Sequence, residues 1–156
     1  MTEMTFLLDV NILLILHDPL HQHYKLVNRW FRQPQNRPFA TCPITQSGMM
    51  RLLLRGLPGL DPFDMQEARE SLHRLVRLPG HVFWPDTPAY LDSTKSISAR
   101  MQGHRQTTDA YLLGLAVHNR GKLATLDGGI RHLAGSEFFA SVEVIEPPGR
   151  LPTRTR

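Results

Sequence analysis

The segment FLLDVNILLIL, residues 6–16, is almost entirely aliphatic, yet it carries an aspartate and an asparagine near its middle. Residues 5–9 have the composition of a buried β-strand, and the residues that follow, up to 16, that of a short helix. A carboxylate that is buried without a partner is costly, so Asp9 requires a compensating group. The segment therefore predicts a core strand that delivers a carboxylate to a site.

The bulk composition fits one soluble globular domain. The chain has 156 residues, 41% of them hydrophobic, which is enough for a sizeable core. No apolar run approaches the roughly 20 residues of a membrane-spanning helix, and no signal-peptide pattern is present. The single cysteine, Cys42, fits a reducing compartment, so we expect a cytoplasmic protein. We expect the domain to occupy residues 1–147 and the basic, Pro-rich residues 148–156 to form a flexible tail.

The basic residues are unequal in kind. The formal net charge is +4, and 15 of the 18 basic residues are Arg. Arg presents a planar fork that binds phosphate through two hydrogen bonds, so this balance favours a polyanionic partner. A GC-rich genome would produce the same ratio, and charge alone therefore leaves a nucleic-acid partner open.

Strand and helix periodicities alternate along the chain. Further strands are predicted at 38–42, 81–84, 122–126 and 141–145, and helices at 23–32, 45–56, 64–77, 109–120 and 128–134, with weak helical character at 90–101. Thr45 is expected to cap one helix, and Thr107 or Thr108 another. The helix at 109–120 is apolar around most of its circumference, which predicts that it is central or meets a second subunit. The alternation predicts an α/β fold, in which helices cover both faces of a parallel sheet.

Three of the 14 acidic residues differ from the others, which fit caps, turns or solvated surface. Asp9 ends the first strand, Asp109 opens the helix at 109–120, and Asp127 follows the strand at 122–126. In a doubly wound sheet such positions meet beyond the carboxyl ends of the strands, where ligands bind. We therefore expect the three carboxylates to converge, although helix capping by two of them and a turn at the third would also explain their positions.

Converging carboxylates repel one another and raise at least one pKa unless a cation lies between them. Mg²⁺ or Mn²⁺ takes oxygen ligands, keeps several waters and bridges to phosphate. Such an ion activates water for attack on phosphorus and stabilises the leaving oxygen. The three acids thus predict a hard divalent metal site suited to phosphoryl chemistry.

Other catalytic patterns are missing from the sequence. Cys42 stands at a strand end among apolar residues, and Ser47 lacks the G-x-S-x-G context of an acyl-transfer nucleophile. The pair His21-x-His23 has no cysteine partner for zinc. There is also no Walker or dinucleotide-binding glycine pattern.

Four segments resemble the PIN-domain ribonucleases, specifically the VapC-type toxins of bacterial type II toxin–antitoxin systems. They are LLDVNILL at 7–14, CPITQSGMMRLL at 42–53, TTDAYLLGLA at 107–116 and KLATLDGGI at 122–130. They occur in the family's order and cover nearly the whole chain. The resemblance implies a three-layer α/β/α fold with a central, mostly parallel sheet, and a ribonuclease that depends on Mg²⁺ or Mn²⁺.

Matched position by position, the resemblance makes Asp9, Asp109 and Asp127 the metal ligands and catalytic residues. Asn11 falls on a polar position that supports the first acid, and Thr108 on a small hydroxyl position beside Asp109. Arg51, and Arg105 in the loop before the helix at 109–120, are candidate contacts to substrate, with ordinary exposed Arg as the alternative.

One position departs from the family. Where relatives usually have Thr-Glu-x-Gly, this chain has TQSG at 45–48, so Gln46 stands in place of an acid. Gln offers a carbonyl oxygen but no charge. This difference favours one metal ion over two and leaves weakened catalysis open.

The leading prediction is a metal-dependent endoribonuclease that is the toxin of a toxin–antitoxin pair and hydrolyses RNA phosphodiester bonds. The resemblance implies structured RNA such as tRNA or rRNA as substrate, a cognate antitoxin that blocks the acidic pocket, and a homodimer. The alternative, motivated by Gln46, is a catalytically weakened PIN-like protein that binds RNA or the antitoxin. A haloacid-dehalogenase-like phosphatase is more distant, because that chemistry usually wants a second Asp where the chain has Asn11.

Overall fold

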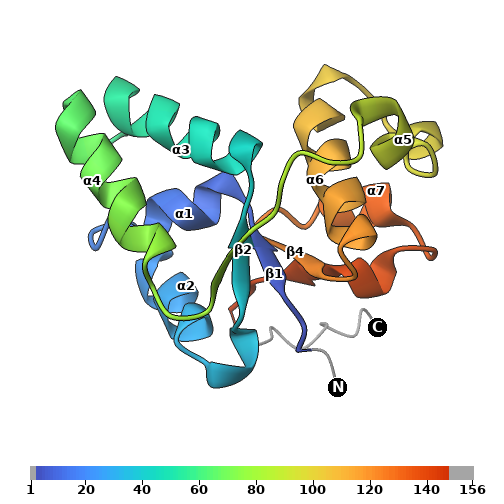
Figure 1. Cartoon of the computed structure of the whole chain (residues 1–156), viewed down its shortest axis with the longest axis horizontal. Coiled ribbons are helices and arrows are strands. Elements are labelled where there is room, and N and C mark those ends of the chain that lie inside the picture. Colours follow the sequence, from blue (N-terminus) through green and yellow to red (C-terminus); the bar gives the residue numbers. More distant parts are fainter. Residues whose placement is uncertain (1–2, 148–156) are drawn as a thin grey trace, which may run out of the picture.

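The computed structural model describes residues 3–147, which form a five-stranded sheet between two layers of helices (Figure 1). The strands are β1 (Phe6–Leu8), β2 (Phe39–Thr41), β3 (His81–Phe83), β4 (Lys122–Thr125) and β5 (Val142–Val144). Their order in the sheet is β3-β2-β1-β4-β5, and every neighbouring pair is parallel. The predicted three-layer α/β/α class is confirmed, and the sheet is wholly parallel. The predicted tail at 148–156 lies outside the described residues.

The helices divide between the two faces of the sheet. The first layer holds α1 (Val10–Leu16), α2 (Tyr24–Phe31), α3 (Pro43–Arg55) and α4 (Met65–Val76), and the second holds α5 (Tyr90–Thr94), α6 (Thr107–His118) and α7 (Ile130–Ala134). Short 3-10 turns cover Pro34–Asn36, Ser98–Arg100, His104–Gln106 and Phe139–Ser141. No helix within residues 3–147 is long and apolar enough to cross a membrane.

The aliphatic run of β1 is continuous because both faces of this strand are covered. Phe6 and Leu8 pack in the cluster of the first helix layer, while Leu7 packs in the cluster of the second. Leu7 and Leu8 have no exposed surface. As the central strand, β1 therefore joins the two halves of the core.

Two predicted helix starts are wrong. The third helix begins at Pro43, and its N-cap is Cys42, whose backbone N–H donates to Thr45 Oγ1 at 3.0 Å. Proline suits the first helical position, because its missing N–H has no intrahelical partner there. In α6, Thr107 and Thr108 lie inside the helix, because the 3-10 turn at His104–Gln106 leads directly into it and Gln106 is the N-cap.

The chain changes direction across the sheet between β1 and β4. From β1 it moves outward through β2 to β3, and it then returns to the other side of β1 as β4 before continuing to β5. Leu8 of β1 pairs with Ala124 of β4, and the backbone N–H of Asp9 donates to the Ala124 carbonyl at 3.0 Å. The carboxyl ends of β1 and β4 thus form the topological switch point, where ligands bind in open α/β sheets.

The sixth helix is central, as its composition predicts. Residues Ala110–Ala116 are all buried. Gly114 allows α5 to approach closely, because a Cβ added there would lie 2.1 Å from the Ser93 carbonyl oxygen. The packing of α6 matters for the site because its first turn carries Asp109.

We expect Gly114→Ala to destabilise the protein although Ala favours helix formation. The gain in helix propensity, about 1 kcal/mol, is smaller than the cost of forcing backbone apart. A melting temperature lower by roughly 2–6 °C in a thermal unfolding experiment is the expected result. Gly103→Ala is the matched control, because no atom lies within 4 Å of a Cβ added at Gly103. Equal melting temperatures for the two variants would contradict the close approach of α5 and α6.

Candidate active site

The carboxylate of Asp9 is held between the first helix and the fourth strand. Asp9 is the N-cap of α1, where Oδ1 accepts a hydrogen bond from Val10 N at 2.7 Å, and Oδ2 accepts one from Thr125 Oγ1 at 2.9 Å. Burial raises the pKa of Asp9 above its ordinary value. The hydrogen bonds from Thr125 and Val10 oppose this rise, and the charge of Asp127 adds to it.

Thr125 connects two of the three acids. Its side chain is buried at the end of β4, and its Oγ1 accepts a hydrogen bond from Asp127 N at 3.1 Å while donating to Asp9. Thr125 is not among the residues predicted from the sequence, where it resembles an ordinary core threonine. The only signal for it is a hydroxyl two residues before Asp127 at the end of a buried strand.

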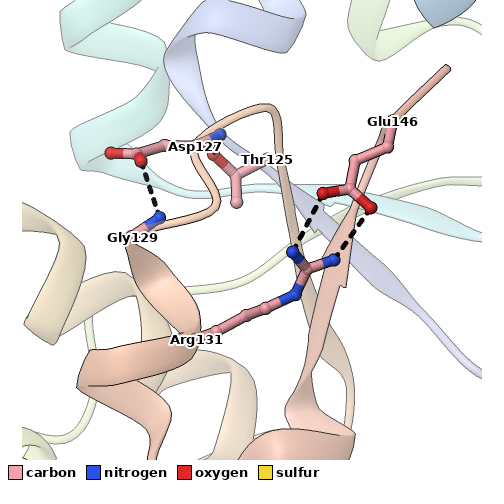
Figure 2. Close-up of polar contacts among 5 residues, drawn as sticks. All are labelled: Thr125, Asp127, Gly129, Arg131 and Glu146. Carbon is pink, nitrogen blue, oxygen red and sulfur yellow. Dashed lines mark hydrogen bonds and ion pairs between the residues drawn. The ribbon is translucent and has the colours of Figure 1, made fainter. Parts of the chain in front are cut away.

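Asp127 lies on the turn that follows β4 (Figure 2). The carboxylate is exposed, and its Oδ1 accepts a hydrogen bond from Gly129 N at 2.8 Å. Arg131, the basic residue nearest along this turn, forms two hydrogen bonds with Glu146, at 2.9 and 3.1 Å. Figure 2 shows its guanidinium directed to Glu146 and not to the Asp127 carboxylate.

Asp109 completes the group from the first turn of α6. Burial is the main cause that raises the pKa of Asp109 to about 6, and the charges of Asp9 and Asp127 raise it further. The three side chains are therefore close enough to repel one another. Within residues 3–147 the ion pairs join Arg100 to Glu137 and Arg131 to Glu146, so none of the three carboxylates has a basic partner.

The donor chemistry of this group fits a hard divalent cation. Carboxylate oxygens are the ligands that Mg²⁺ and Mn²⁺ prefer, and a cation would offset both the burial of the Asp109 carboxylate and its repulsion by Asp9 and Asp127. In the part of the chain that the structure describes, no three His, Cys, Asp or Glu side chains are already arranged to hold a metal ion. An ion would therefore draw the carboxylates together or reach some of them through water.

A hollow of about 310 Å³ lies beside the carboxylates. Its walls include Val10 and Thr108, which are next to Asp9 and Asp109 in the sequence, and Arg51 of α3. Gly48, also in its wall, lets α3 approach α1, because a Cβ at this position would lie 2.7 Å from Val10 Cγ2. Arg105 is exposed on the turn before α6 and is not part of this wall.

Two predicted site residues form no hydrogen bond with the three carboxylates among the described residues. Asn11 is exposed, and the Asp9 oxygens are bonded by Val10 and Thr125, so a supporting role of Asn11 stays a prediction. Gln46 donates from Nε2 to Thr41 Oγ1 at 3.0 Å. Thr41 is the last residue of β2, the strand that lies between β1 and β3. The hydrogen bond of Gln46 therefore goes to a neighbouring strand and not to the three carboxylates.

Comparisons with known proteins agree on one family. The PIN domain model matches residues 6–136. Ribonuclease VapC29 of Mycobacterium tuberculosis is 39% identical to this chain over 85% of it and 92% of the relative. Ribonuclease VapC39 of the same organism is 34% identical over 91% of this chain and all of the relative. The structure of VapBC2 from Rickettsia felis bound to a promoter DNA fragment has a chain with a TM-score of 0.64 and 11% identity, covering 92% of this chain.

Replacing Asp109 with Asn is expected to stabilise the metal-free protein at pH 7. Because the pKa of Asp109 is raised from 3.8 to about 6, the folded state binds more protons than the unfolded state between these values. The free energy of unfolding therefore falls as the pH rises from about 4 to 6. In EDTA at pH 7 we expect Asp109→Asn to melt about 2–4 °C higher, on the order of 1 kcal/mol after allowance for solvent screening.

The two proteins are expected to converge in stability near pH 4, where the Asp109 carboxyl of the wild type is protonated in the folded state. Asp61→Asn, at an exposed position, serves as the control for removing one negative charge. A melting temperature of Asp109→Asn equal to that of Asp61→Asn at pH 7 would contradict the raised pKa of Asp109.

Proposed function

This chain belongs to the PIN-domain family, among the VapC-type ribonuclease toxins, and we propose that it hydrolyses RNA with a divalent metal ion held by Asp9, Asp109 and Asp127. The observation that carries the proposal is a group of three mutually repelling carboxylates at the switch point of the sheet, for which residues 3–147 provide no basic partner. Mg²⁺ is the expected ion, with Mn²⁺ as its substitute.

When bound, such an ion neutralises the carboxylates, activates a water for attack on phosphorus and stabilises the leaving oxygen. The residues of the chain hold the carboxylates in position. Asp9 is fixed by its bonds to Val10 and Thr125, and Asp127 by the turn that Gly129 closes. Thr125 is a positioning residue, because its hydroxyl joins the Asp9 carboxylate to the Asp127 backbone.

The hollow beside the acids suits an RNA phosphate. Arg51 contributes a guanidinium and Thr108 a hydroxyl to its wall, and both are exposed. A guanidinium binds two phosphate oxygens at once, so Arg51 would orient the scissile phosphodiester toward the carboxylates. Arg105, on the turn that leads to α6, would meet the RNA backbone further along the strand.

The proposed substrate is structured RNA such as tRNA or rRNA, and the proposed partner is a cognate antitoxin that blocks the acidic site. Relatives of this chain are named as VapC ribonucleases, and a chain with the same fold occurs in the VapBC2 structure. A homodimer in the cytoplasm completes the proposal. The catalytically weakened alternative is not favoured, because relatives that are 34% and 39% identical over most of this chain are named ribonucleases.

We expect purified protein to cleave structured RNA in the presence of Mg²⁺ or Mn²⁺ and to stop when EDTA is added. Asp9→Asn, Asp109→Asn and Asp127→Asn should each lower the cleavage rate by at least about 100-fold, because each removes one of the charges that hold the ion. The rates are measured by gel electrophoresis of labelled RNA. Asp61→Asn is the matched control, and Gln46→Glu is expected not to raise the rate.

Cleavage that survives EDTA, or that is unaffected by Asp9→Asn, would overturn the proposed site. An inactive wild type combined with an active Gln46→Glu variant would instead support the weakened alternative. Thermal unfolding gives a second readout, because binding of Mn²⁺ to the folded state raises the melting temperature of the wild type but not of the Asp→Asn variants.

A variant pair at Thr125 tests the positioning role. Thr125→Val removes the hydroxyl that bonds Asp9, so we expect cleavage about 10-fold slower and a higher Mn²⁺ concentration for half-maximal activity. Thr125→Ser keeps a hydroxyl and should restore both values largely to those of the wild type. If Thr125→Val changes stability but leaves the Mn²⁺ dependence unaltered, Thr125 is only structural.

A further inference from the structure

A larger cavity, of about 880 Å³, lies between α3, α4 and β3, and the proposed reaction does not use it. Its size falls within the range of pockets that hold small organic groups. The wall is mainly apolar, with contributions from Met50, Met65, Leu72 and Phe83. Met65 is 56% exposed and Phe83 is 50% exposed, so these surfaces are open to a ligand.

The aromatic wall comes from an edge strand. Phe83 is the last residue of β3, which pairs only with β2 among the described strands. An exposed aromatic ring in a cavity offers a planar surface on which a nucleobase can stack, and proteins recognise unpaired RNA bases in this way.

A chain of hydrogen bonds lies at the polar end of the cavity. The Gln46 amide donates to the buried hydroxyl of Thr41, which lies 2.8 Å from Nε2 of His81. Burial lowers the pKa of His81, which favours the neutral ring. Both hydrogen bonds form when the Thr41 hydroxyl accepts from Gln46 and donates to Nε2 of His81. The proton of the neutral His81 ring is then on Nδ1.

This arrangement leaves one acceptor and one donor for a ligand. Within residues 3–147 neither Gln46 Oε1 nor His81 Nδ1 has a hydrogen-bond partner. An acceptor and a donor at one end of an apolar slot match the hydrogen-bonding edge of a nucleobase. An apolar peptide side chain would leave both groups without partners, which is unfavourable.

Charge and location also favour RNA. Arg69 in the wall has no ion-pair partner among the described residues, whereas Glu70 accepts a hydrogen bond from Gln66 at 3.0 Å. Gln46 lies in the first turns of α3, whose other side, with Ser47 and Arg51, lines the hollow beside the carboxylates. The cavity and the hollow proposed to hold the phosphate therefore lie on two sides of the same helix.

We propose that this cavity binds an unpaired base of the RNA substrate, stacked on Phe83 and read by Gln46 and His81. The proposal rests on the proposed ribonuclease function and assigns to it a specificity site. A base held there would fix which phosphodiester bond reaches the carboxylates.

The test uses the full chain with Asp9→Asn, so that RNA is bound but not cleaved. The probe is a single-stranded RNA decamer containing 2-aminopurine, whose fluorescence falls when it stacks on an aromatic ring. We expect Phe83→Ala to abolish this quenching and weaken binding about 10-fold, while Phe83→Trp retains both. Leu91→Ala is the control, because Leu91 is 82% exposed on α5, outside the cavity.

A second arm compares affinities for the four homopolymeric decamers. Gln46→Leu removes the acceptor and should reduce the difference between the preferred base and the others to less than about threefold. The affinity of the Gln46→Leu variant for RNA averaged over the four decamers should change little, because Gln46 is not proposed to bind the phosphates. Each variant's melting temperature is measured first, and Phe83→Trp reports on stacking if Phe83→Ala does not fold.

The outcomes separate the two proposals. If wild type cleaves RNA with metal but Phe83→Ala binds the decamers as tightly as Leu91→Ala, the base site is wrong and the ribonuclease stands. If binding and quenching depend on Phe83 but no metal-dependent cleavage occurs, the base site stands and the ribonuclease fails. Unchanged RNA binding with loss of antitoxin binding in Phe83→Ala would assign the cavity to a protein partner and overturn the proposal.

Discussion

The repulsion among Asp9, Asp109 and Asp127 is the constraint on which the account of this protein depends. The three carboxylates come from the ends of β1 and β4 and from the start of α6, and the described residues give them no basic partner. Burial is the main cause of the raised pKa values of Asp9 and Asp109, and the charges of the neighbouring carboxylates raise both values further. We propose that a cation bound at the switch point of the sheet offsets this repulsion.

The rest of the fold serves to hold these positions. The central strand, β1, is buried on both faces, and Asp9 follows its carboxyl end. There Thr125, at the end of β4, donates a hydrogen bond to Asp9. The close contact of α5 with Gly114 sets the position of α6 and thus of Asp109. The helices of the first layer also border two hollows of different size: a small one near Arg51 and a large, mainly apolar one near Phe83.

Much of the fold could be predicted because its signals are local. The continuous aliphatic run of β1 indicates a strand covered on both faces, and the positions of the three acids at strand and helix ends predict that they meet. Thr125 could not be identified, because a buried threonine that packs and one that bonds a carboxylate look the same in sequence. The direction in which the Gln46 side chain points could not be predicted either. It depends on where α3 begins, because successive side chains are about 100° apart around a helix, and α3 begins at Pro43. The cavity between α3, α4 and β3 depends on tertiary packing that no local pattern reports.

Binding of one divalent ion by the three carboxylates can be observed in a crystal structure of the protein grown with Mn²⁺, with anomalous diffraction recorded to locate manganese. We expect one anomalous peak between Asp9, Asp109 and Asp127, with carboxylate oxygens or bridging waters at about 2.0–2.4 Å. No peak at this place, with the carboxylates closed on a basic side chain such as Arg51, would contradict this expectation.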